Sequence, residues 1–186
     1  LIANDYIYLV LRFYLRFKTL PNFKNPKTFN EKIMYFNLNN RKNIHTLLSD
    51  KYLVKDYIKE KIGPKYIIKT LYVTSDPKTI EFDKLPNSFI IKGTHGSGCN
   101  IIVNDKNKID EKTIIKQCEY FLSINYYHYF RCYQYYNIKP RIMIEKLLLD
   151  EHGNIPVDYK FFSFRGRTKV IQIDIDRFSN HERLLL

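Results

Sequence analysis

The strongest constraint on the fold is a pair of apolar runs separated by a short glycine-rich loop. Phe89–Ile91 is typical of a buried strand, Lys92 ends it, and Ile101–Val103 forms a second strand after the loop Gly93–Asn100. A Gly-Ser-Gly turn lets backbone N–H groups cluster around phosphate oxygens, because no Cβ blocks their approach. The lysine adds a point charge from a fixed strand end. The segment predicts a phosphate site, with an ordinary glycine-rich hairpin and a surface lysine as the alternative.

Composition narrows the class of partner. The chain has 186 residues, of which 45% are hydrophobic, and this is a globular composition rather than a disordered one. Lysine and arginine exceed the acids by 31 to 19, and the net charge of +12 favours anionic partners. Nucleotide phosphates, nucleic acid, acidic glycans and an anionic membrane surface all fit. Cys99, Cys118 and Cys132 form no C-x-x-C pair, so the sequence predicts neither a disulfide framework nor a zinc site, and a reducing cytosol fits best.

The chain before the loop has helical patterns. Tyr6–Phe17 is too short to span a bilayer and predicts an amphipathic helix, docked on the core or on a membrane surface. Docking on the core is favoured, because most amphipathic helices face a core. Thr28 with Glu31 predicts a capping box that opens a second helix. A third helix is expected to begin at Ser49-Asp50-Lys51 and to end at Gly63-Pro64.

The chain after the loop mixes helix and strand. Asp110 is the expected N-cap of a helix that covers the sheet. Three strand-like runs, Arg141–Leu149, Val157–Phe164 and Thr168–Asp176, are expected to form an antiparallel meander. The predicted class is α+β, with a helical N-terminal part followed by mixed or antiparallel sheets and a covering helix.

A tyrosine-rich tract, Tyr126–Tyr136, precedes these strands. Its rings are expected to pack in the core, as aromatic side chains usually do. The alternative is that they stack on sugars or bases, with Arg131, Lys139 and Arg141 holding phosphate or carboxylate.

Four motifs follow one another along the chain. They are an Asp-Lys pair at a helix start, a strand that ends in lysine before a glycine-rich loop, a strand that ends in Glu-Lys and apolar residues, and a strand that begins with an acidic residue. The most specific segments are Asn25–Lys32, His95–Gly98, Asn137–Arg141, Asp158–Phe162 and Asp176–His181. Together they resemble the ATP-grasp superfamily, and in particular its TupA-like (teichuronopeptide-biosynthesis) branch. The resemblance runs from about Asn25 to His181.

This resemblance implies an adenine nucleotide, ATP, as cofactor. Lys51 and Lys92 would neutralise its α- and β-phosphates, and Glu145 would lie near the adenine amino group. The remaining implied contacts are a loop over the β- and γ-phosphates (His95, Gly96, Ser97 and Gly98), a backbone hinge that reads the adenine edge (Lys146 through Leu148), and a carboxylate for the ribose hydroxyls (Asp158). Taken singly, each of these charged residues would be interpreted as a solvated surface charge or a strand-end ion pair, and only their order along the chain favours the nucleotide.

The resemblance also implies catalytic residues and a metal. Arg177, His181 and Arg183 would steady the transferring phosphate. The Mg²⁺ ligands of the superfamily come from strands expected beyond Leu186, so no metal ligand is assigned here and Asp174 and Asp176 are interpreted as structural or substrate-proximal. The C-terminal lobe is therefore expected to be incomplete, and the chain alone is expected not to turn over ATP. The implied domains are a helical region (1–48), a small ATP-grasp subdomain with the glycine-rich loop (49–139) and the start of the C-terminal lobe (140–186).

The function implied for the intact protein is an ATP-dependent carboxylate–amine ligase in cell-surface polysaccharide biosynthesis. It would act in the cytoplasm or at the inner face of the membrane, on an acidic glycan or amino-acid substrate and without nucleic acid. Any peripheral membrane contact would be made by the N-terminal helix, as the alternative to its docking on the core. Two alternatives stay open: a basic, tyrosine-rich nucleic-acid-binding module, and a non-catalytic or glycosyltransferase-associated protein of glycan biosynthesis.

Overall fold

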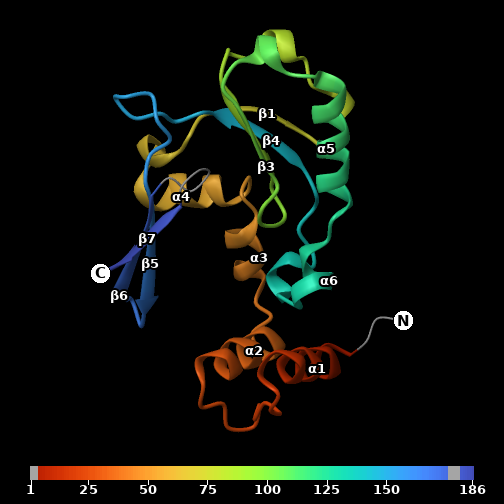
Figure 1. Cartoon of the computed structure of the whole chain (residues 1–186), viewed down its shortest axis with the longest axis vertical. Coiled ribbons are helices and arrows are strands. Elements are labelled where there is room, and N and C mark those ends of the chain that lie inside the picture. The colour runs from red at the N-terminus through yellow and green to blue at the C-terminus, as the bar shows by residue number, and fades with distance from the viewer. Residues whose placement is uncertain (1–3, 176–180) are drawn as a thin grey trace. The chain divides into compact units, whose positions relative to one another are not determined.

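The computed structural model describes residues 4–175 and 181–186 (Figure 1). It divides into two compact units, Leu1–Lys146 and Leu147–Leu186. The described residues form six α-helices and two antiparallel sheets, so the α+β class predicted from the sequence is confirmed. The three-part division at residues 48 and 139 stays a prediction.

The first helix, α1 (Asp5–Phe17), begins where the Asn4 side chain accepts a hydrogen bond from the Tyr6 N–H at 2.9 Å. It buries Leu9 and Phe13, so one of its faces is docked as expected. Its Asp5 carboxylate accepts a hydrogen bond from the Tyr127 hydroxyl at 2.6 Å. This contact joins α1 to the tyrosine-rich tract, which forms the short helix α6 (Tyr126–Phe130) and a turn after it.

The rings of the tyrosine-rich tract pack mainly on one another. Tyr126 stacks on Phe130 with ring centroids 4.4 Å apart, and Tyr127 meets Tyr136 edge-on at 4.8 Å. Tyr127 is buried, whereas Tyr129 and Tyr136 are exposed. Core packing therefore accounts for the centre of the tract.

The second helix, α2 (Phe29–Asn39), has the predicted capping box. The Thr28 Oγ1 accepts from the Glu31 N–H at 3.3 Å, and the Glu31 carboxylate accepts from the Thr28 N–H at 2.9 Å. The same carboxylate also accepts from the N–H groups of Asn22 at 2.9 Å and Lys27 at 3.0 Å. These backbone donors, Asn22 first and Thr28 next, lower the pKa of Glu31 to about 2.

The predicted start of the third helix was wrong. The chain instead forms α3 (Asn43–Ser49), breaks, and then forms α4 (Val54–Ile62). The cause is Asp50, whose buried carboxylate accepts hydrogen bonds from the N–H groups of Tyr52 at 2.9 Å and Leu53 at 3.2 Å. These bonds hold Asp50 in an extended conformation at the end of α3 and form a capped turn that leads into α4.

The first sheet is built in the first unit from strands that are distant in sequence. Its order is β1 (Thr70–Thr74), β4 (Ile142–Lys146), β2 (Phe89–Gly93) and β3 (Asn100–Val103), with every neighbouring pair antiparallel. The helix α5 (Glu111–Ser123), capped by Asp110 as predicted, packs along one face (Figure 1). The core on that face contains Phe89, Ile91, Val103, Ile114, Cys118, Ile142 and Ile144.

The prediction of a three-stranded meander was wrong for the first of its three strands. Arg141–Leu149 gives β4, which pairs between β1 and β2 in the first sheet. The reason is burial, because Ile142 through Glu145 are all buried and a strand covered on both faces suits the centre of a sheet. The meander of the second unit is β5 (Asp158–Phe164), β6 (Arg167–Ile175) and β7 (Glu182–Leu185).

We predict that Glu31→Gln destabilises the protein at neutral pH in a pH-dependent way. The folded pKa of about 2 lies below the unfolded value of about 4.3, so the contribution is complete above pH 4.3 and is lost as the pH falls toward 2. The urea midpoint of the variant should lie clearly below that of the wild type at pH 7, and the gap should shrink below about pH 4.3. Glu60→Gln, at an exposed site in α4, is the control. A gap that does not change with pH would contradict the cap assignment.

Candidate functional site

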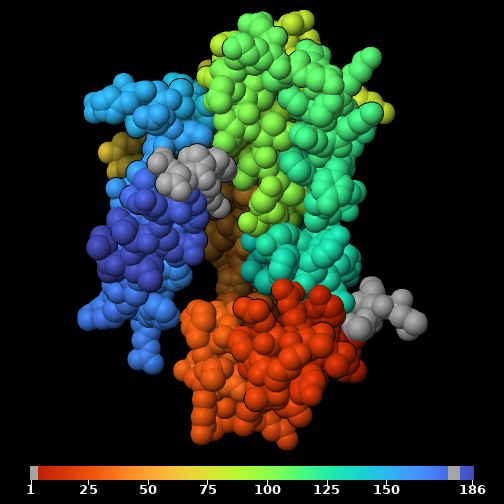
Figure 2. Space-filling model, viewed as in Figure 1, coloured from red at the N-terminus to blue at the C-terminus, as the bar shows by residue number. Residues whose placement is uncertain are grey.

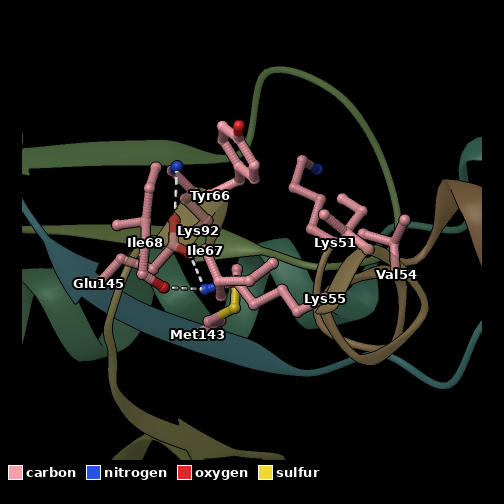
Figure 3. Close-up of a pocket in the computed structure, with 10 residues that line it drawn as sticks. Lys51, Val54, Lys55, Tyr66, Ile67, Ile68, Lys92, Met143 and Glu145 are labelled. Atoms are coloured by element: carbon pink, nitrogen blue, oxygen red, sulfur yellow. Dashed lines mark hydrogen bonds and ion pairs between the residues drawn. The ribbon is translucent and has the colours of Figure 1, made fainter. Parts of the chain in front are cut away.

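The face of the first sheet opposite α5 borders a cavity. Lys92, Met143 and Glu145 lie on this face, and α4 supplies the facing wall (Figure 3). The cavity has a volume of about 250 Å³. Its lining combines a charged part (Lys51, Lys55, Lys92 and Glu145) with a mainly apolar part (Val54, Ile58, Tyr66, Ile67, Ile68 and Met143).

Glu145 joins two lysines at the floor of this cavity. Its side chain is 3% exposed, and its Oε2 accepts a hydrogen bond from the Lys92 Nζ at 2.6 Å. The other carboxylate oxygen, Oε1, forms an ion pair with Lys55 (Figure 3). Two cations therefore meet one buried anion, and the cluster keeps a net positive charge.

The two lysines differ in how many of their donors are already used. Lys55 also donates to the Ile68 carbonyl at 2.8 Å and to the Thr70 Oγ1 at 2.6 Å, so its three N–H donors all have protein partners. The Lys92 Nζ donates only to Glu145 among the described residues, and its side chain is 22% exposed. Lys92 can therefore contact a ligand while it keeps its partner.

Lys55 was missed by the sequence reasoning. It lies four residues after Lys51, a spacing that places both side chains on one side of a helical segment. That spacing was the available signal. What it could not reveal is the partner, because Glu145 is ninety residues away in the sequence and reaches Lys55 only through the sheet.

Lys51 holds the base of the glycine-rich loop. Its Nζ donates to the carbonyl oxygens of Gly93, at 2.9 Å, and Gly96, and its backbone N–H donates to the Thr94 carbonyl at 3.1 Å. Burial lowers the pKa of the ammonium, and the nearby charge of Lys92 lowers it further. Lys51 and Lys92 thus line the same cavity, but Lys51 lies against the loop and apart from the Lys92–Glu145 pair (Figure 3).

The first half of the loop is fixed. Thr94 is buried and its N–H donates to the Arg141 carbonyl at 2.9 Å. The His95 ring is buried, and its Nε2 lies 2.9 Å from the Phe121 carbonyl near the end of α5. Since a carbonyl accepts, Nε2 carries the proton, and the buried Nδ1 has no partner among the described residues. Burial lowers the pKa of His95, so the ring is neutral at pH 7.

The tip of the loop is exposed and its backbone donors are unused. Ser97 and Gly98 are exposed, and Gly98 has φ +82°, which favours glycine. A Cβ on Gly96 would lie 3.3 Å from the Tyr126 ring, so a side chain there would crowd α6. The N–H groups from His95 to Gly98 donate to no protein group in residues 4–175 and 181–186. The N–H groups of Ser97 and Gly98, the exposed residues of this run, can donate hydrogen bonds to an anion.

A second cavity, of about 260 Å³, lies beside α3 in the same unit. Its charged wall contains the Asp50–Arg141 ion pair, in which the Arg141 Nη1 lies 3.2 Å from the buried Asp50 Oδ2. No hydrogen bond joins the Nε or Nη2 of Arg141 to another described residue, so these donors stay available. The remaining lining residues are Asn43, Thr46, Leu47, Leu53, Asn137, Ile138 and Lys139.

The second unit contains a separate charged cluster around Asp174. This buried carboxylate accepts from the Arg183 Nε at 2.9 Å, lies 3.0 Å from the His181 Nε2, and pairs with Lys160. Asp158 lies 3.1 Å from the same lysine. Asp174 therefore positions cations, which agrees with the structural interpretation given to it.

The predicted site residues thus fall into two sets. The first unit holds Lys51, Lys92, the loop His95–Gly98, Glu145 and Lys146, whose N–H already donates to the Lys69 carbonyl at 3.1 Å. The second holds Leu148, Asp158, His181 and Arg183. Arg177, and with it Asp176, lies outside the described residues.

No group of three or more His, Cys, Asp or Glu side chains in residues 4–175 and 181–186 could hold a metal ion. No helix in the same ranges is long and apolar enough to cross a membrane.

Comparison with known protein families gives a match. A family model described as TupA-like ATPgrasp matches residues 31–186, which include the lysine–glutamate cluster and the glycine-rich loop. No curated protein and no solved structure gives a match. The matched stretch is most of the chain, and it confirms the resemblance inferred from the motifs. The chain therefore belongs to the TupA-like ATP-grasp family.

Proposed function

We propose that this protein binds ATP on the open face of the first sheet, and that the intact protein uses it to activate a carboxylate for attack by an amine. The observation that carries the proposal is the run of unused N–H donors at His95–Gly98, close to Lys51 and in the same unit as Lys92. Backbone donors and ammonium groups in one unit suit a phosphate chain. Family membership supports the nucleotide as the source of that phosphate.

The cavity and the loop tip fit different parts of the nucleotide. The cavity of about 250 Å³ is slightly below the range of about 300 Å³ and above that is usual for ligand pockets. It therefore suits the flat adenine ring, with Ile67, Ile68 and Met143 as its apolar contacts. The phosphates would interact with Lys92 and the Ser97–Gly98 tip. His95 and Lys51 would position the loop, since both are already bonded to other parts of the first unit.

The family also implies Mg²⁺, which would offset the charge that develops during phosphoryl transfer. Residues 4–175 and 181–186 contain no group of three or more His, Cys, Asp or Glu side chains that could hold a metal ion. No step is assigned to the metal here. The contribution that we assign to the chain is to bind the nucleotide, to orient it and to neutralise phosphate charge.

We further propose that the cavity beside α3 takes the acidic substrate. A guanidinium with free donors can bind a carboxylate through two parallel hydrogen bonds, and the Asp50 partner keeps Arg141 in a fixed orientation. Lys139 adds a second positive charge, and the amide groups of Asn43 and Asn137 suit hydroxyl groups. An acidic sugar or amino acid has the chemistry that this lining would recognise.

The remaining assignments rest on the family and stay proposals. Leu148 would contribute to the adenine hinge, Asp158 would bind ribose, and His181 and Arg183, with Arg177, would steady the transferring phosphate. We propose that the protein acts in the cytoplasm, where it takes part in the biosynthesis of a cell-surface polysaccharide. The Asp174 cluster supports the phosphate role, because it gathers several cationic groups around one acid.

The rival function, nucleic-acid binding, is less well supported by the tyrosine-rich tract. Tyr127 is buried and bonded to Asp5, so the centre of the tract offers no open stacking surface. We predict weak oligonucleotide binding at physiological salt and no base preference in a fluorescence anisotropy titration. Tight binding of single-stranded RNA that Tyr129→Ala abolishes would favour the rival instead.

We predict that Lys92→Met weakens ATP binding by about 2 kcal/mol or more, about thirtyfold in Kd, because a charge-assisted contact is lost. Titration calorimetry with ATP measures this. Lys59→Met, an exposed lysine on α4, should leave the affinity unchanged.

Adenosine separates a phosphate contact from damage to the fold. Because adenosine has no phosphate, the Lys92→Met variant should bind it as the wild type does. Equal losses of ATP and adenosine affinity would show that Lys92 acts by holding Glu145 in place.

For the second cavity, we predict that glucuronate shifts the amide resonances of Asn43 and Lys139 and that glucose does not. Lys139→Gln should weaken glucuronate binding by about 1 kcal/mol, about fivefold, with ATP affinity unchanged. Lys112→Gln, on the exposed side of α5, is the control. Equal shifts from both sugars would contradict a carboxylate site.

A further inference from the structure

The helix α1 has two apolar faces, and only one of them is covered. Leu9 and Phe13 are buried against the rest of the first unit. Ile7, Leu11, Tyr14 and Leu15 are all about half exposed or more. Their spacing of four, three and one places them in a single stripe on the opposite side of the helix. We call these four residues the α1 stripe, and the helix that carries them lies at the surface of the molecule, in red in Figure 2.

The charge around the α1 stripe has one sign. Between Asp5 and Glu31 the chain contains no acidic residue and five basic ones, Arg12, Arg16, Lys18, Lys24 and Lys27. Four of these are exposed, and the fifth, Arg12, donates to the Tyr129 carbonyl. Lys18, the C-cap residue of α1, follows Leu11 by seven residues and Tyr14 by four. This spacing places its charge at the C-terminal end of the α1 stripe.

The acids that bound this segment do not offset its charge. Asp5 is paired with Arg41 at 2.7 Å and bonded to the Tyr127 hydroxyl. Glu31 is buried in the capping box. An exposed apolar stripe in a segment, residues 6–30, whose charged residues are all basic matches the two components of an anionic lipid surface, which are an apolar layer and a negatively charged plane.

We propose that α1 lies in the plane of an anionic membrane surface, with the α1 stripe in the acyl boundary and the basic residues at the headgroups. The helix is 13 residues long and lies along the surface, since no described helix is suited to cross a membrane. The exposed Leu20, just beyond the helix, extends the apolar contact.

One observation favours a lipid surface over a second copy of the chain. Pairing two α1 stripes would bring two acid-free segments together, each with five basic residues, and like charges would oppose that contact. The family match begins at residue 31, so α1 lies outside the stretch that the nucleotide-binding family accounts for. The proposal is therefore independent of the proposed function, and either one can fail alone.

The test is co-sedimentation with phosphatidylcholine vesicles, with and without an equal amount of phosphatidylglycerol. We expect the protein to pellet with the anionic vesicles and to stay in solution with the neutral ones. High salt should reduce the bound fraction, since screening weakens the electrostatic part. Leu11→Ser with Leu15→Ser should lower the bound fraction at least tenfold.

The matched control is Ile33→Ser with Ile62→Ser, which removes two exposed aliphatic side chains from α2 and α4. Circular dichroism and the thermal unfolding midpoint of each variant show whether it is folded. Equal pelleting with both vesicle types, or unchanged pelleting of the stripe variant, overturns the proposal. Sedimentation velocity without lipid gives a further check, because self-association that the stripe variant abolishes would identify a second copy as the occupant.

Discussion

The architecture of the face of the first sheet opposite α5 depends on one buried carboxylate. Glu145 lies at the centre of the first sheet and forms ion pairs with Lys92 on the neighbouring strand and with Lys55 on α4. A buried ion pair adds little net stability by itself, but removing one partner of such a pair costs about 3–5 kcal/mol. Glu145 therefore acts mainly as a constraint. It keeps α4 over the sheet and gives Lys92 one orientation.

A second group of contacts ties the glycine-rich loop to the same frame. The Asp50 side chain caps the turn before α4 and pairs with Arg141, and the Arg141 carbonyl accepts from Thr94. Lys51, next to Asp50, holds the carbonyls at the base of the loop. Three segments that are distant in sequence, around Asp50, Thr94 and Arg141, are thus joined directly by hydrogen bonds and an ion pair. The two cavities described above both border this junction, since Lys51 lines one and Asp50 lines the other.

The features that could be predicted from the sequence have local causes. The capping box of α2, the pair β2–β3, and the helix after Asp110 each depend on residues within a few positions of one another. The position of β4 in the first sheet could not be predicted from neighbouring residues. Its apolar run fits several strand partners, and only the burial of both faces selects the centre of the first sheet. The candidate site shows the same division, since the loop and Lys92 were predicted whereas the role of Lys55 depends on a partner ninety residues away.

The anchoring of the glycine-rich loop has a consequence for the thermodynamics of ligand capture. Ordering one residue of a flexible backbone costs about 1–2 kcal/mol of conformational entropy. Thr94 and His95 are already fixed by Arg141 and Phe121, so only the Ser97–Gly98 tip is left to become ordered around a ligand. A loop free from Gly93 to Asn100 would lose the entropy of eight residues, whereas this one loses that of about two. The protein therefore meets the cost of ordering this segment largely when it folds, and an anion bound at the tip would meet a loop that is already largely ordered.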